Sequence, residues 1–217
     1  MVKLSAIQLT STPDVEQNIK AIANQLAKLT QVSNNAGVEH IVVLPECCLF
    51  FGVSDKAQLS LAQQSENDFK GKSELQLALS KLAKEYKVTL IGGTIPILAE
   101  SGDKFTNTCC VFNSQGELLT GYDKIHLFDV NVEDSEKTYF ESRYTQAGNK
   151  ACVAKTPVAN IGLSVCFDVR FPLLYQKLNE LGADIITVPS AFTRVTGKAH
   201  WQALLQARAI ENQVYII

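Results

Sequence analysis

The chain has 217 residues, of which 46% are hydrophobic and 19% are charged, so it can form one large globular domain over residues 1–217. Its 20 basic and 22 acidic residues give a formal net charge of −2 and form no Lys/Arg run, which excludes nucleic acid as the main partner. No apolar run reaches the roughly 20 residues that a membrane span needs, so we expect a soluble protein without a membrane partner.

The first segment, residues 2–9, alternates apolar and polar side chains and lacks the long apolar stretch of a signal peptide, so we expect a strand there. The six cysteines comprise two adjacent pairs plus Cys152 and Cys166, without the spacing of a zinc site. We therefore expect reduced thiols in a cytoplasmic protein, most of them buried as small hydrophobic side chains.

Helices and strands alternate through the first half of the chain. Apolar residues at helical spacing predict a helix that follows Asp14 and ends at 34–37, where turn-forming residues gather. A continuous apolar strand is expected over 40–44, a second helix over 75–86 and another apolar strand over 88–95. This βαβ order indicates parallel strand pairing.

The second half of the chain adds antiparallel pairing. Strands at 106–112 and 117–122 flank an Asn-Ser-Gln-Gly turn, which predicts a hairpin and therefore a mixed sheet. Residues 124–148 are polar and aperiodic, and we expect a long loop that forms a wall of the site. The remaining expected elements are strands at 151–155 and 160–165, a helix at 171–181, a strand at 184–188, a helix at 197–212 and a strand from 213, which makes about nine strands and four helices.

Three expected strand ends carry reactive side chains, namely Glu46, Lys124 and Cys166. Sites in open α/β sheets form just beyond the strand ends. Cys166 lies between an apolar strand and an expected helix, and the positive end of that helix would favour its thiolate. Taken singly, each residue has an ordinary interpretation, as a buried thiol or a solvated surface charge. Their combination predicts nucleophilic catalysis.

The Glu, Lys and Cys residues and their flanks resemble the nitrilase superfamily of carbon-nitrogen hydrolases. The densest matches are 122–129, 166–172, 189–201 and 207–212, in family order along essentially the whole chain. The resemblance implies an α/β fold, a four-layer alpha-beta-beta-alpha sandwich with mixed sheets. The chain stops at Ile217 within an apolar strand, where relatives continue, so we expect a form that lacks the C-terminal strands.

By this resemblance Cys166 is the nucleophile, and Glu46 is the general base and later the acid. Lys124 and the backbone N–H of Phe167 would stabilise the tetrahedral oxyanion. Glu141 matches a second family glutamate that would orient Lys124 and the substrate, although a loop carboxylate without such a role is the alternative. Since these groups supply nucleophile, proton shuttle and charge, we expect no metal or organic cofactor.

The residues after the nucleophile indicate the substrate class. Nitrilases proper usually have Trp directly after the Cys, whereas Phe167 here resembles the amidase branch with deaminated glutathione amidase and omega-amidase. That resemblance implies that Arg170 and Thr196 bind an α-keto carboxylate and that Phe192 lines the pocket. A structural ion pair of Arg170 with Asp168 or Asp184 is the alternative. Residues 190–192 and 207–212 favour the deaminated glutathione type, and an omega-amidase acting on alpha-ketoglutaramate is the alternative.

Two other classes compete with a small-molecule amidase. A cysteine peptidase needs a histidine base, and His40, His126 and His200 lack the flanking signature and order of that class. A non-catalytic binding protein on the same fold is the second alternative.

The last predicted helix points to a homodimer. Trp201, Leu204, Leu205 and Ile210 make it apolar enough to pack on its own sheet and on a partner subunit. The alternative is that all four side chains face their own sheet.

Overall fold

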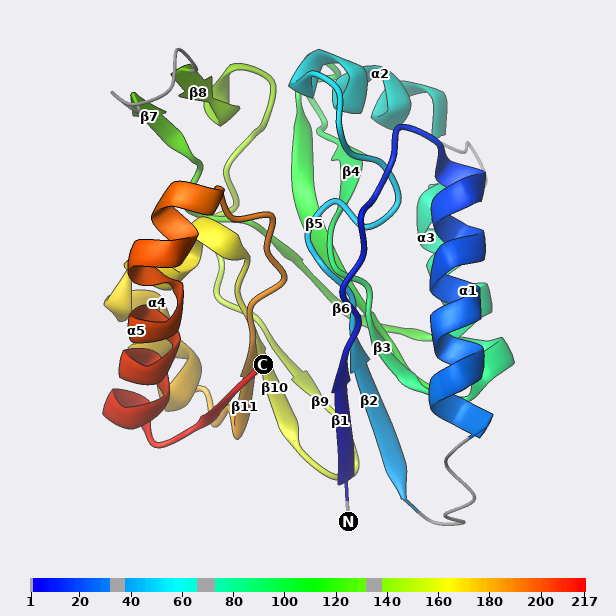
Figure 1. Ribbon diagram of the computed structural model, residues 1–217, viewed down its shortest axis with the longest axis vertical. Coiled ribbons are helices and arrows are strands. Elements are labelled where there is room, and N and C mark those ends of the chain that lie inside the picture. Colours follow the sequence, from blue (N-terminus) through cyan, green and yellow to red (C-terminus); the bar gives the residue numbers. More distant parts are fainter. Residues whose placement is uncertain (1, 32–37, 66–72, 132–137) are drawn as a thin grey trace.

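The computed structural model describes residues 2–31, 38–65, 73–131 and 138–217. Within these ranges the chain forms two larger sheets, each covered on its outer face by helices, and a short separate hairpin (Figure 1). None of the helices in these ranges is both long and apolar enough to cross a bilayer.

The first sheet combines parallel and antiparallel strands. Its order is β1-β2-β3-β5-β4, with β6 paired to β5. The first three strands are parallel, and β5 runs antiparallel to β3, β4 and β6. The strands are β1 (Val2–Ala6), β2 (Glu39–Val43), β3 (Thr89–Ile91), β4 (Ile95–Leu98), β5 (Phe105–Phe112) and β6 (Leu118–Asp123), and the covering helices are α1 (Val15–Gln31) and α3 (Glu74–Tyr86).

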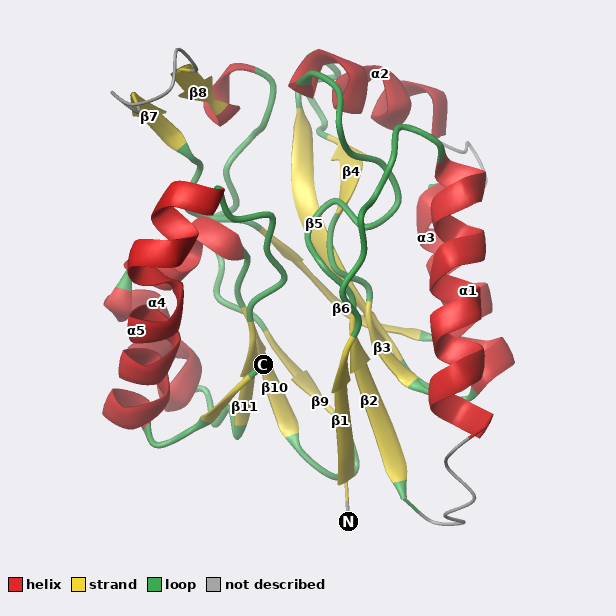
Figure 2. Cartoon of the chain, viewed as in Figure 1, coloured by secondary structure: helices red, strands yellow, loops and turns green. Residues whose placement is uncertain are grey.

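The second sheet has the order β12-β11-β10-β9, in which only the β9–β10 pair is antiparallel. Helices α4 and α5 lie side by side on its outer face (Figure 2). These elements are β9 (Val153–Lys155), β10 (Asn160–Leu163), β11 (Ile185–Thr187), β12 (Tyr215–Ile216), α4 (Pro172–Glu180) and α5 (Arg194–Asn212).

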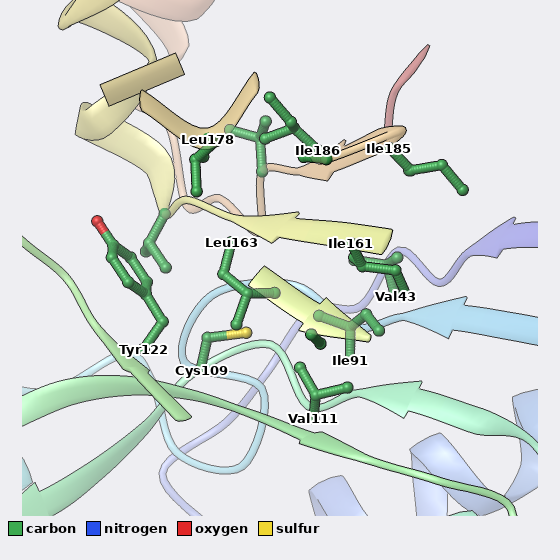
Figure 3. Packing of buried hydrophobic residues seen from close by; sticks show 14 of the residues in the cluster. Val43, Ile91, Cys109, Val111, Tyr122, Ile161, Leu163, Leu178, Ile185 and Ile186 are labelled. Atoms are coloured by element: carbon green, nitrogen blue, oxygen red, sulfur yellow. The ribbon is translucent and has the colours of Figure 1, made fainter. Parts of the chain in front are cut away.

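Two apolar clusters hold the layers together. In Figure 3, Val43, Ile91 and Val111 of the first sheet face Ile161 and Leu163 of the second. The other cluster packs α1 and α3 on the opposite face of the first sheet. The layers therefore follow the order helices, sheet, sheet, helices, and the expected alpha-beta-beta-alpha sandwich with mixed sheets is confirmed.

Local sequence signals explain several boundaries. Asp14 Oδ1 accepts the backbone N–H of Gln17 at 2.9 Å, as expected for a residue that begins α1. Ser73 and Gln76 form a reciprocal capping box at the start of α3. The predicted end of the first helix at 34–37 lies outside the described residues.

Two expectations about secondary structure were wrong, and one helix was missed. The strand expected over 88–95 is divided into β3 and β4, because Gly93 turns the chain with φ of +58°. The loop expected over 124–148 contains the paired strands β7 (Asp129–Asn131) and β8 (Thr138–Phe140). Helix α2 (Asp55–Ser65) was not expected, since its segment has only a weak apolar stripe.

Two glycines, Gly93 and Gly148, let their segments pack closely against the backbone just before Glu46 and Lys124. A Cβ at Gly93 would lie 2.0 Å from the carbonyl oxygen of Pro45, and one at Gly148 would lie 2.1 Å from that of Asp123. Only glycine permits these approaches without backbone movement. The two glycines thus help to fix the positions of the following Glu46 and Lys124.

Candidate active site

Glu46, Lys124 and Cys166 each lie just beyond the end of a strand. Glu46 follows β2, Lys124 directly follows β6, and Cys166 follows β10. Strand β6 is antiparallel to β5, and β5 is antiparallel to β3. Strand β6 therefore runs in the same direction as β1, β2 and β3. The three residues line one cavity of about 420 Å³ at the carboxyl ends of the strands. Its remaining walls come from α2 and the segment before it, β4, β5, β8 and the segment before α5.

The Lys124 ammonium is buried between two carboxylates. Its Nζ lies 3.1 Å from Glu46 Oε1 and 3.1 and 2.9 Å from the two oxygens of Glu141, while the residue is only 2% exposed. Burial alone would lower the pKa of Lys124, but Glu46 and Glu141 raise it well above its usual value. Lys124 therefore remains a cation throughout the neutral range.

The Glu46 carboxylate is held by groups from three other segments. Its Oε1 accepts from Asn107 Nδ2 at 3.1 Å as well as from Lys124, and its Oε2 accepts the backbone N–H of Ala191 at 2.9 Å. Cys166 lines the same cavity, and Glu46 is the charged group with the largest effect on the pKa of its thiol. Glu46 is therefore the proton acceptor closest in effect to the sulfur.

The expectation that a helix end favours the thiolate of Cys166 was wrong. Burial and the nearby charge of Glu46 raise the pKa of Cys166 well above its usual value, and Lys124 offsets this only in part. The helix that begins at Cys166 is a five-residue 3-10 turn, and the α-helix α4 begins only at Pro172. Cys166 thus rests as a thiol, and its attack requires a base.

Glu141 directly follows β8, is the first residue of a short 3-10 helix, Glu141–Arg143, and lines the cavity. Its Oε2 accepts the backbone N–H of Phe128 at 2.7 Å. Burial and Glu46 raise the pKa of Glu141, although Lys124 opposes the change. Two carboxylates share one ammonium here, so Glu141 holds a proton to higher pH than an ordinary glutamate.

Sequence reasoning missed Asn107, which lies on β5 between two threonines. Its amide reaches Glu46 at 3.1 Å and Glu141 at 3.5 Å, and its backbone carbonyl accepts the N–H of Lys124 at 3.0 Å. Thr145 was also missed: it lines the cavity, and its buried hydroxyl has no hydrogen-bond partner among the described residues. The available signal for Asn107 was a Thr-Asn-Thr run within an otherwise apolar strand.

The expected substrate-binding residues divide into two groups. Phe167, Phe192 and Thr196 line the cavity, whereas Arg170 is not among its described lining residues. The Arg170 guanidinium lies 5.9 Å from the ring centre of Phe167 and 5.5 Å from that of Phe192, and it contacts His200 Nδ1 at 3.3 Å.

The alternative of an ion pair between Arg170 and Asp168 is not favoured, because the Asp168 carboxylate is hydrogen-bonded by Tyr122, His126 and the backbone of Val165.

Among the described residues that line the cavity none is a histidine, which removes the base that a cysteine peptidase would need.

Comparison with known proteins defines the family. A family model for carbon-nitrogen hydrolases matches residues 3–217. The chain is 41% identical over 215 residues to a deaminated glutathione amidase of Yersinia enterocolitica, covering 99% of this chain and 71% of the relative. It is 34% identical over 217 residues to omega-amidase NIT3 of Saccharomyces cerevisiae, covering 100% of this chain and 72% of the relative.

The crystal structure of Saccharomyces cerevisiae Nit3, a member of branch 10 of the nitrilase superfamily, superposes with a TM-score of 0.84 at 32% identity. The alignment covers 99% of this chain and 73% of that one. The chain belongs to the carbon-nitrogen hydrolase family, within the nitrilase superfamily.

The effect of Glu46 on Cys166 generates a prediction about pH. Glu46→Gln removes an anion that raises the pKa of Cys166, so the midpoint for iodoacetamide alkylation of Cys166 should move to lower pH. Loss of the base should nevertheless reduce amide hydrolysis by about 10²-fold or more. Alkylation rates measured by mass spectrometry from pH 6 to 10 should then be higher in Glu46→Gln than in the parent or in the surface variant Glu16→Gln. Equal or slower alkylation of Glu46→Gln would contradict this effect of Glu46.

Proposed function

We propose that this chain is a thiol amidase that hydrolyses the amide C–N bond of a small α-keto-acid amide through a thioester on Cys166. The observation that carries the proposal is that one cavity is lined by the Cys166 thiol, the Glu46 carboxylate and the buried Lys124 ammonium bonded to that carboxylate. Its family membership and its identity to named amidases support the same reaction.

Acylation begins with proton transfer. Glu46 removes the Cys166 proton as the sulfur forms a bond to the amide carbonyl carbon, and the carbonyl π electrons move to its oxygen. The resulting oxyanion is stabilised by the fixed charge of Lys124 and the backbone N–H of Phe167. The C–N bond then breaks, and the leaving nitrogen takes the proton held by Glu46. The products of this half-reaction are the free amine, or ammonia, and the thioester.

Deacylation repeats the sequence with water. Glu46 takes a proton from a water molecule as the water oxygen adds to the thioester carbon. Lys124 again stabilises the oxyanion. The carbon–sulfur bond breaks, and the departing sulfur recovers the proton from Glu46. The carboxylic acid product leaves and the resting thiol is restored, so no external oxidant or reductant is needed.

In this proposal Glu141 and Asn107 hold the charged groups in place. Glu141 offers two oxygens to Lys124, and Asn107 donates toward both carboxylates. Because these bonds exist before substrate enters, little reorganisation is required when the oxyanion forms. The same set supplies nucleophile, proton shuttle and charge, so the proposal uses no metal or organic cofactor.

The charges around the cavity indicate where a substrate carboxylate would bind. Glu46, Glu141 and Asp55 line the cavity and disfavour an anionic group near them. Arg170 lies beside the ring of Phe192, toward the end where Thr196 lines the cavity. We therefore assign the α-keto carboxylate to the Phe192–Thr196 end, with Arg170 as its counter-charge.

The substrate proposal follows the relatives. Deaminated glutathione amidases of Yersinia enterocolitica and Synechocystis are 41% and 38% identical to this chain, and omega-amidases of yeast and Xenopus tropicalis are 34% and 36% identical. We propose deaminated glutathione as the substrate type, with alpha-ketoglutaramate as the second candidate.

Hydrolysis should depend on Cys166. Cys166→Ala removes the sulfur that forms the thioester and should abolish detectable turnover while leaving the melting temperature nearly unchanged. Cys152→Ala is the matched control, because Cys152 is partly buried away from the cavity lining and should retain full activity. Substantial turnover by Cys166→Ala in an amine-release assay would refute the proposed reaction.

Carboxylate recognition should depend on the shape of Arg170 as well as its charge. Arg170→Lys keeps the positive charge but loses planar two-point contact, so kcat/KM on deaminated glutathione should fall by about tenfold or more. A simple aliphatic amide without a carboxylate should be hydrolysed equally by both proteins. Equal losses on the two substrates would remove Arg170 from carboxylate recognition, and higher efficiency on alpha-ketoglutaramate would favour the omega-amidase alternative.

We also propose a homodimer in a reducing, cytoplasmic setting, where the six free thiols of the chain persist. Trp201, Leu204 and Leu205 pack partly on the core of their own subunit, whereas Ile210 is 70% exposed. Leu173 on the adjacent helix is 75% exposed. The outer α4–α5 face therefore offers apolar surface to a second copy.

Ile210→Glu should shift the protein toward the monomer, since it places a charge on that apolar face. Val158→Glu is the control, because Val158 is exposed in the turn between β9 and β10. Light scattering at matched concentration measures the mass of both variants. A dimer that tolerates Ile210→Glu, or a monomeric parent protein, would contradict this interface.

A further inference from the structure

The carboxylate of Asp168 is fully buried and accepts four hydrogen bonds. Its Oδ2 accepts from the Tyr122 hydroxyl at 2.7 Å and from the backbone N–H of Val165 at 2.8 Å. Its Oδ1 contacts the backbone N–H of His126 at 3.0 Å and His126 Nδ1 at 2.7 Å. Two partners on each oxygen leave the carboxylate little capacity for another donor.

These partners come from the two segments that carry Lys124 and Cys166. Tyr122 and His126 stand two residues before and two residues after Lys124. Val165 immediately precedes Cys166, in the segment that follows β10 of the second sheet. The Tyr122 hydroxyl also accepts the backbone N–H of Ile125 at 3.3 Å. One side chain thus joins the end of β6 in the first sheet to the turn after β10 in the second.

The turn at Cys166 requires such support. Cys166 has φ of +46°, a left-handed conformation that costs a residue with a side chain on the order of 1–3 kcal/mol. The backbone N–H of Asp168 donates to the carbonyl of Val165 at 3.0 Å, and its side chain accepts the N–H of Val165 in return. This reciprocal pair closes the turn around the nucleophile.

We infer that Asp168 is a positioning residue, which sets the place of the Cys166 sulfur relative to the Lys124 ammonium by bonding both segments. The inference rests on the proposed function, because it concerns the same nucleophile and the same oxyanion charge. Asp168 is not among the described residues that line the cavity, so it acts through its neighbours and not on substrate.

Two buried tyrosines, Tyr122 and Tyr175, allow the positioning role of Asp168 to be tested with a matched pair of variants. Tyr122 and Tyr175 are both fully buried, and each hydroxyl bonds near Cys166. The Tyr122 hydroxyl bonds to Asp168, whereas that of Tyr175 bonds to Ser164 at 2.7 Å and touches neither Asp168 nor the Lys124 segment in any described hydrogen bond. Phe substitution removes one buried hydroxyl in each case and preserves the ring.

Tyr122→Phe should lower kcat by about tenfold or more with KM changed by less than about twofold, because the binding surface is untouched while the reacting groups are displaced. Alkylation of Cys166 by iodoacetamide at neutral pH should slow in parallel. Tyr175→Phe should lose similar unfolding free energy but keep kcat and the alkylation rate within about twofold of the parent. Equal losses of kcat in the two variants, or unchanged kcat in both, would overturn the positioning role.

A double-mutant cycle extends the test to Asp168 itself. In an Asp168→Asn background, Tyr122→Phe should have little further effect on kcat, because the two substitutions break one interaction. Additive losses would overturn the inference, and if Asp168→Asn does not fold, the tyrosine comparison still decides it. If the parent protein hydrolyses none of the tested amides, the proposed function fails, whereas the alkylation rates of Tyr122→Phe and Tyr175→Phe still test the positioning of Cys166.

Discussion

The buried ammonium of Lys124 is the charge around which the cavity is arranged. Removing an ion of this kind from water costs several kcal/mol unless partners replace its hydration. Glu46 and Glu141 supply that replacement, and each carboxylate is in turn bonded by Asn107 and a backbone N–H. Deleting one member would therefore remove a hydrogen bond or a counter-charge from at least one other buried group of the cluster.

The two-sheet architecture brings this cluster to the thiol. Glu46, Lys124, Glu141 and Asn107 belong to the first sheet and its connections, whereas Cys166 and the Ala191 N–H follow strands of the second. Packing between the sheets therefore sets the distance between nucleophile and ammonium. Substitutions at the sheet–sheet contact seen in Figure 3, remote from the cavity, can consequently change activity through this distance.

Much of the architecture could be predicted from local patterns. Apolar periodicity predicted the main helices and most strands, and strand-end positions placed Glu46, Lys124 and Cys166 at one edge. Helix α2 and the β7–β8 pair were missed because their segments are short or weakly apolar. Asn107 and Asp168 have roles that depend on partners more than 30 residues away in sequence, which no local pattern encodes. The thiolate prediction failed because burial and Glu46 outweigh a short helical turn at Cys166.

The central claim is that this arrangement makes Cys166 attack an amide carbonyl. The most direct measurement is intact-protein mass spectrometry of the enzyme quenched in acid during turnover of deaminated glutathione, followed by peptide mapping. The account predicts an added mass equal to the acyl part of the substrate, located on Cys166 and lost when turnover is complete. Turnover without any such adduct under conditions where a synthetic thioester on Cys166 survives the quench, or an acyl group on another residue, would contradict it.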